Sequence, residues 1–90
     1  MQLFEWDEEK ARTNFKKHGV RFETAAKVFL DENRIDIYDA AHSAEEDRYI
    51  TIGKAGEVLF VVYTERLPKI RMISARLATA RERRLYYGNF

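Results

Sequence analysis

The side chains best suited to chemistry in this chain are arginines, lysines, tyrosines and a histidine beside a lysine pair. The histidine occurs in the stretch Asn14-Phe15-Lys16-Lys17-His18-Gly19-Val20. Arginine binds phosphate oxygens in a bidentate manner, and tyrosine rings stack on unpaired bases. These residue types therefore favour a phosphate-containing substrate over a carbonyl substrate.

Cleavage of RNA without metal would use this inventory in three ways. One group takes the proton from the 2′-hydroxyl, cations stabilise the phosphorane, and another group protonates the leaving 5′-oxygen. General acid–base groups contribute roughly 10²–10⁴-fold to such a rate, and preorganised cations add a comparable or larger effect. Arginine does not release its proton, so the titratable candidates are His18, Lys17, Glu65 and the tyrosines.

The charge is unevenly distributed along the chain. Residues 66–84 contain seven basic residues and one acid, Glu82, and carry +6, whereas the whole chain carries +1, so the remainder carries −5. Such a split indicates a cationic C-terminal face for a polyanion or an acidic partner. The alternative interpretation is a solvated, arginine-rich helix.

Several other classes of protein do not fit this sequence. A chain of 90 residues predicts one domain, spanning residues 1–90. The chain has no cysteine, its two histidines show no metal-ligand spacing, and its four glycines are scattered, so we expect no metal and no cofactor. We expect no signal peptide and no membrane span, because no apolar run approaches about 20 residues. The expected location is the cytoplasm.

The N-terminal third predicts a short strand followed by two helices. Leu3 to Trp6 favours a strand, and Asp7 is a good N-cap for a helix over residues 8–17. In that helix Ala11, Phe15 and His18 share one face, and Gly19 suits the left-handed turn that ends it. An apolar stripe then predicts a second helix over residues 22–30, which carries Phe22, Ala25, Ala26 and Phe29.

The rest of the chain alternates as strands and ends in a helix. Strands are expected around 35–38, 48–52, 58–63 and 70–73, and the continuous apolar run 58–63 is typical of a central strand covered on both faces. Thr79 with Glu82 is a capping-box pattern that opens a helix to about Tyr87. We therefore predict an α+β fold, in which two N-terminal helices and one C-terminal helix pack on a small antiparallel meander.

Motifs along nearly the whole chain resemble the BrnT toxin family. They are Phe4-Glu5-Trp6-Asp7, Lys17-His18-Gly19-Val20, Phe22-Glu23 with Ala25 and Val28-Phe29-Asp31, Glu46 to Gly53, Tyr63-Thr64-Glu65-Arg66, Ile70 to Arg76, Ala78-Thr79, Arg81 to Arg84, and Tyr86. They also occur in the expected order.

This resemblance implies a RelE-like fold and a ribonuclease toxin that stops translation. It also implies a partner, a BrnA-like antitoxin of the ribbon-helix-helix type. Two toxins would assemble on an antitoxin dimer as a heterotetramer, and the complex would repress its own operon. Contact with DNA would then be indirect, through the antitoxin.

Two positions depart from the family pattern. Arg21 stands where relatives usually carry a serine that can cap the second helix. Loss of this cap lowers stability by about 1 kcal/mol. Tyr63 stands where relatives often carry histidine. If that histidine is catalytic in relatives, this chain must use a phenol instead, or the residue is structural.

The candidate site follows from the charge split and the family motifs. We expect five side chains to converge on one RNA phosphate as catalytic residues: Lys17, His18, Arg48, Arg71 and Arg76. Further RNA contacts are expected from Arg81, Arg84 and Tyr86. The alternative function is a non-catalytic module that binds nucleic acid or an antitoxin.

His18 itself allows two interpretations. It either ends the helix and faces the core, or it belongs to the site. The negative end of the helix dipole favours a protonated ring by typically ~0.3–1 kcal/mol. As a site residue, His18 is therefore expected to act as a general acid or a phosphate ligand rather than as a base.

Overall fold

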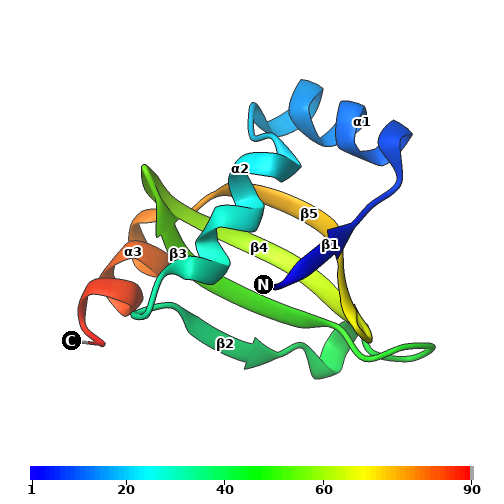
Figure 1. Cartoon of the computed structure of the whole chain (residues 1–90). Helices are drawn as coiled ribbons and strands as arrows, with labels where there is room; N and C mark the ends of the chain where they lie inside the picture. The colour runs from blue at the N-terminus through cyan, green and yellow to red at the C-terminus, as the bar shows by residue number, and fades with distance from the viewer. Residues whose placement is uncertain (90) are drawn as a thin grey trace.

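The computed structural model describes residues 1–89, and Phe90, the last residue of the predicted domain, lies outside them. The described elements pack as helices around a curved sheet (Figure 1). In chain order they are β1 (Leu3–Glu5), α1 (Glu8–His18), α2 (Phe22–Ala26), the 3₁₀ helix η1 (Lys27–Leu30), β2 (Ile35–Tyr38), the 3₁₀ helix η2 (Ala40–His42), β3 (Tyr49–Ala55), β4 (Glu57–Arg66), β5 (Lys69–Leu77) and α3 (Ala80–Tyr87).

The sheet has the strand order β1-β5-β4-β3-β2. Strands β2 to β5 pair antiparallel with their sequence neighbours, which confirms the predicted meander. Strand β1 instead lies parallel to β5 at the edge, where Phe4 is opposite Ile70. The short turns that imply antiparallel pairing are absent between β1 and β5, so local sequence carried no signal for this pair.

Helix α1 begins and ends as its caps predict. The Asp7 carboxylate accepts hydrogen bonds from the backbone N–H groups of Glu9 and Lys10, which holds the pKa of Asp7 below its usual range. At the other end Gly19 has φ 71°, and its N–H donates to the carbonyl of Phe15. A left-handed residue at this position turns the chain away from α1 towards α2.

The predicted helix over residues 22–30 is divided into α2 and η1. Phe22, Ala25 and Val28 are fully buried, a spacing of three residues that suits the tighter 3₁₀ turn. Arg21 supplies no side-chain cap, as its departure from the serine pattern predicts. Its guanidinium lies over the ring of Phe15, 4.4 Å from the centroid.

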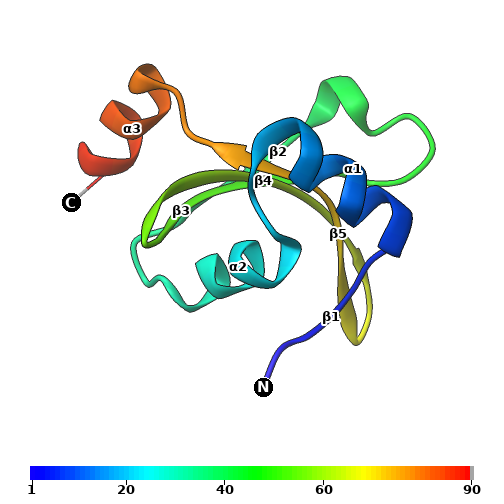
Figure 2. The same cartoon turned by 90° about the horizontal axis from the view of Figure 1, so that it is seen from above.

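Both faces of β4 are covered, as predicted for a central strand. Leu59, Val61 and Tyr63 belong to the core beneath α1, α2 and η1. Val58 faces the other way and packs with Tyr86 of α3. Figure 2 shows α2 and α3 on opposite sides of the sheet.

The predicted capping box of α3 is present. The Thr79 hydroxyl accepts from the N–H of Glu82, and the Glu82 carboxylate accepts from the N–H of Thr79.

Within residues 1–89, no helix combines the length and apolar character that a membrane crossing requires.

Candidate active site

The α3 side of the sheet presents two rows of cross-strand neighbours. One row contains Ile50, Val62 and Ser74, and the next contains Phe60 and Arg76. Cross-strand partners share a face of the sheet, and Phe60 packs against the core that includes α3. We call this surface, defined by these five residues, the α3-side face.

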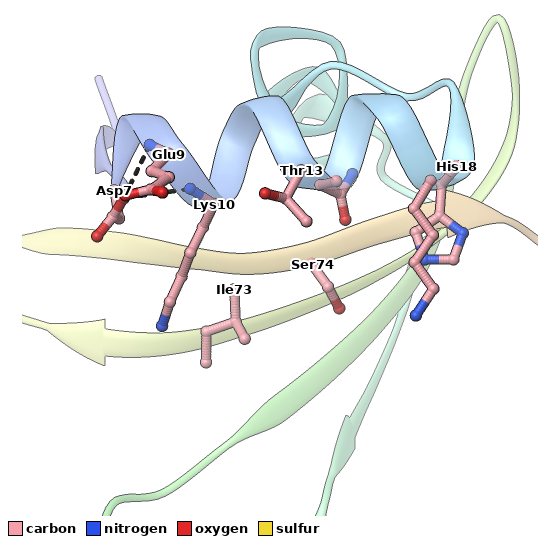
Figure 3. A pocket seen from close by; sticks show the side chains of 9 residues that line it. Asp7, Glu9, Lys10, Thr13, His18, Ile73 and Ser74 are labelled. Carbon is pink, nitrogen blue, oxygen red and sulfur yellow. Dashed lines mark hydrogen bonds between the residues drawn. The ribbon is translucent and has the colours of Figure 1, made fainter.

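Next to this face, a groove of about 460 Å³ separates α1 from β5. The register between β4 and β5 shifts between Val62 and Tyr63, so Ile73 has no direct partner. Ile73 and Ser74 form the strand wall of this groove, and Lys17 and His18 contribute to the helix wall. The other lining residues are Asp7, Glu9, Lys10, Thr13 and Asn14. In Figure 3 the side chains of Ile73, Ser74 and His18 lie on the same side of the β5 ribbon.

Asn14 joins the two walls of this groove. Its Nδ2 donates to the carbonyls of Val20, at 3.1 Å, and Ala75, at 2.9 Å. Its Oδ1 accepts from the N–H of Ala75 at 3.0 Å. Because Ala75 lies between Ser74 and Arg76, the side chain of Asn14 sets the position of α1 against β5.

The inward face of α1 differs from the expected one. Asn14 is 6% exposed, whereas Phe15, predicted to face inwards, is 41% exposed. Sequence reasoning missed Asn14 because a polar residue was not considered for the core. The available signal was its position three residues after Ala11, which lies on the same face.

His18 both ends α1 and lines the groove. Its side chain is half-buried, and it does not belong to either buried core cluster of residues 1–89. Lys17 is exposed at the same end of the helix. The structure therefore supports the helix stop but not the core-facing ring, since the side chain of His18 lines the groove that Ser74 also lines.

Arg76 is held by an ion pair with Glu82 on α3. Nη1 donates to Oε1 at 2.8 Å and Nη2 donates to Oε2 at 2.9 Å. The hydrogen bonds with Glu82 raise the pKa of Arg76, and those with Arg76 lower the pKa of Glu82. Arg76 and Ser74 are two residues apart on one strand face, so their Cα atoms are about 7 Å apart.

The remaining predicted catalytic arginines lie elsewhere. Arg71 pairs with Glu5 of β1 at 3.0 Å, further along β5. Arg48 lines a different hollow with His42 and Arg66. The five predicted residues therefore do not line one pocket, since Lys17 and His18 share the groove and Arg76 lies beside it on the same strand as Ser74.

Two of the predicted RNA-binding residues are accessible and the third is not. Arg81 and Arg84 are exposed on α3. Tyr86 is 2% exposed, and its hydroxyl donates to the Asp31 carboxylate. The expectation that this ring stacks on a base is therefore corrected, because the ring anchors α3 to the turn after η1.

Tyr63, the second departure from the family pattern, is a core residue. Its ring packs edge-on against Phe29, with centroids 5.0 Å apart, on the face away from Arg76. Burial and the nearby Asp36 raise the pKa of Tyr63 to about 12. The structure therefore supports a structural role for Tyr63 in the core.

The chain is similar to a described family and to solved protein structures. A family model described as a ribonuclease toxin, BrnT, of type II toxin–antitoxin systems matches residues 6–82. The crystal structure of the ribonuclease toxin BrnT of Brucella abortus has a TM-score of 0.66 to this chain, at 25% sequence identity. The match covers 88% of this chain and 99% of that chain. No curated protein matches this chain in sequence.

Proposed function

Because the chain belongs to the BrnT family of ribonuclease toxins of type II toxin–antitoxin systems, we propose that it cleaves RNA without metal and thereby stops translation. It does so as a single toxin domain of residues 1–90, with a RelE-like arrangement of sheet and helices, in the cytoplasm. One observation of geometry supports this proposal most: the groove lined by Lys17 and His18 has Ser74 in its strand wall, two residues before Arg76 on β5.

The proposed reaction is attack of the 2′-oxygen on the adjacent phosphorus. The 2′-hydroxyl loses its proton to a base, the bond from phosphorus to the 5′-oxygen breaks, and a 2′,3′-cyclic phosphate and a 5′-hydroxyl form. His18 protonates the leaving oxygen or binds the phosphate, and Lys17 and Arg76 stabilise the negative charge of the phosphorane. Cations held in place before the reaction stabilise that charge without a cost of reorganisation.

Arg71, Arg48, Arg81 and Arg84 have a different part in this proposal. They lie outside the groove and bind the RNA strand on either side of the cleaved phosphate, through its backbone charge. Contacts of this kind weaken as salt increases, because bound counterions are released when they form.

A cleavage assay tests this function. Purified protein is incubated with a defined RNA oligonucleotide, with and without a chelator, and the products are identified by mass spectrometry. We expect cyclic-phosphate products in both conditions and no cleavage of the 2′-deoxy oligonucleotide. We also expect Arg76→Ala and His18→Ala each to lower the rate by about 10²-fold or more.

Arg12→Ala is the matched control in this assay. Arg12 is also a cation on α1, but it lines a separate hollow with Phe22 and Glu23, so we expect the wild-type rate. RNA that stays intact, while its binding weakens steeply with salt, would instead identify the non-catalytic nucleic-acid-binding module.

The proposed partner is a BrnA-like ribbon-helix-helix antitoxin, because the family belongs to type II systems. The proposed complex is a heterotetramer with two toxins on an antitoxin dimer, and it contacts DNA only through the antitoxin. Co-expression with a ribbon-helix-helix protein encoded next to the toxin gene tests this. The mass of the purified complex by light scattering gives the stoichiometry, and loss of RNA cleavage shows neutralisation.

A further inference from the structure

The guanidinium of Arg76 has one occupied and one unoccupied bidentate edge. A guanidinium carries five N–H donors in a rigid planar fork. Nη1 donates to Glu82 and, at 3.1 Å, to the carbonyl of Leu77, while Nη2 donates once to Glu82. Within residues 1–89, no hydrogen bond uses Nε–H or the second N–H of Nη2. These two N–H groups are parallel neighbours, which is the geometry that donates to two phosphate oxygens.

The plane of this guanidinium is held by two contacts. Its Cζ lies 3.9 Å from the centroid of the Phe60 ring, so the ring supports one face. The Glu82 carboxylate holds one end with two hydrogen bonds. Both partners are mostly shielded, with side chains 33% exposed for Arg76 and 20% for Glu82.

Glu82 is itself immobilised by the first turn of α3. Its Oε1 accepts from the N–H of Thr79 at 2.8 Å, in addition to Nη1 of Arg76. The same carboxylate therefore completes the capping box and orients Arg76. An arginine held in this way loses little rotamer freedom when it binds a ligand, because its freedom is already restricted in the unbound protein.

We propose that Glu82 is a positioning residue that, with Phe60, presents the free Nε and Nη2 edge of Arg76 to an RNA phosphodiester. The proposal rests on the proposed function, of which it describes the phosphate-binding part. Glu82 offsets the charge of Arg76 at long range, so the attraction of RNA to this place comes mainly from the neighbouring cations. At the phosphate itself, the oriented Nε–H and Nη2–H donors of Arg76 stabilise the negative charge by charge-assisted hydrogen bonds.

Arginine side-chain NMR tests the free edge directly. The Nε–Hε signal of Arg76 is assigned by its disappearance in Arg76→Lys, and wild-type protein is titrated with a fully 2′-O-methylated RNA oligonucleotide that it cannot cleave. We expect the Arg76 signal to shift on saturation and the Arg12 signal to shift less, because Arg12 lines a separate hollow. RNA binding that leaves the Arg76 signal unmoved would overturn the proposal.

Cleavage kinetics test the role of Glu82. Glu82→Gln keeps an acceptor for the capping box but loses the charged bidentate pair, and we expect kcat to fall on the order of tenfold to a hundredfold. KM should change less, because the surrounding cations remain. In the Arg76→Lys background the same change should have little further effect, since no bidentate partner is left to position.

Thr79→Ala controls for damage to α3, because it removes the capping hydroxyl and leaves the ion pair intact, and we expect wild-type kcat. A Thr79→Ala protein that loses as much kcat as Glu82→Gln would show that the stability of α3, and not the orientation of Arg76, is responsible.

Failure of the cleavage proposal can be distinguished from failure of the positioning proposal. Wild-type protein that leaves RNA intact refutes the cleavage proposal, whereas the shift of the Arg76 signal reports the phosphate edge independently.

Discussion

At the scale of single residues, Asn14 positions helix α1 against strand β5. A buried amide can donate twice and accept, and here these bonds go to backbone groups on both sides of the groove. A shorter or apolar side chain leaves these backbone groups without partners in a buried place. Leaving buried polar groups unsatisfied costs more than the bonds themselves contribute.

We therefore expect Asn14→Ala to lower the free energy of unfolding by about 2–4 kcal/mol. The urea midpoint, followed by circular dichroism, measures this loss. Lys16→Ala, at an exposed neighbouring position, is the control and should stay within about 0.5 kcal/mol of wild type. Equal midpoints for Asn14→Ala and wild type would show that the hydrogen bonds of Asn14 do not stabilise the fold.

At the scale of elements, α3 is attached to the sheet through a small number of specific contacts. Its start carries the capping box and the Arg76 ion pair, and its end carries Tyr86, which bonds to Asp31. Although burial raises the pKa of Asp31, hydrogen bonds from Tyr86 and from two backbone N–H groups outweigh burial and lower it overall. Both ends of α3 therefore depend on ionised carboxylates.

Acid should weaken the attachment of α3. Hydrogen bonds from Arg76 lower the pKa of Glu82 below its ordinary value of 4.5, so its stabilisation is present above pH 4.5 and is lost as the pH falls through the folded-state value. We expect the difference in urea midpoint between wild type and Glu82→Gln to narrow from pH 6 to pH 3. A constant difference would contradict this account. Thr79→Ala, which costs about 1 kcal/mol, should keep the wild-type pH dependence.

At the scale of the whole molecule, the sheet has a core on each face, and each core contains a buried tyrosine. Tyr63 lies on β4 beneath α2 and η1, and Tyr86 belongs to α3 and is buried in the core on the other face. Burial is the main cause that raises the pKa of each to about 12, with a carboxylate nearby as the second. Both cores should therefore lose stability over the same alkaline pH range.

Stability should consequently fall between pH 10 and pH 12. A tyrosine whose folded-state pKa exceeds its unfolded value of 10.0 stabilises fully below pH 10, and this contribution is lost as the pH rises towards 12. We expect Tyr63→Phe and Tyr86→Phe to be about 1 kcal/mol less stable at pH 8 and to lose less stability on going to pH 11. Tyr38→Phe, at an exposed position on β2, is the control and should follow wild type. Parallel curves for all four proteins would contradict this prediction.

The sequence by itself determined the features that depend on neighbours along the chain. The N-cap of α1, the glycine that ends it, the capping box of α3 and the meander of β2 to β5 all follow from residues a few positions apart. The continuous apolar run over residues 58–63 also identified the central strand. The family motifs located Lys17, His18 and Arg76 in the chain, and two of these line the groove.

Only the tertiary structure decided how distant segments meet. The parallel pairing of β1 with β5 and the hydrogen bonds of Asn14 to Ala75 join segments about sixty residues apart. The register shift that leaves Ile73 unpaired arises between the neighbouring strands β4 and β5, and Arg48 lines a hollow separate from the groove. The burial of Tyr86 likewise depends on Asp31, far away in sequence. Local periodicity specifies which face of an element is apolar, but not which element covers that face. The packing that minimises exposed apolar surface and unpaired polar groups settles this for the whole chain at once.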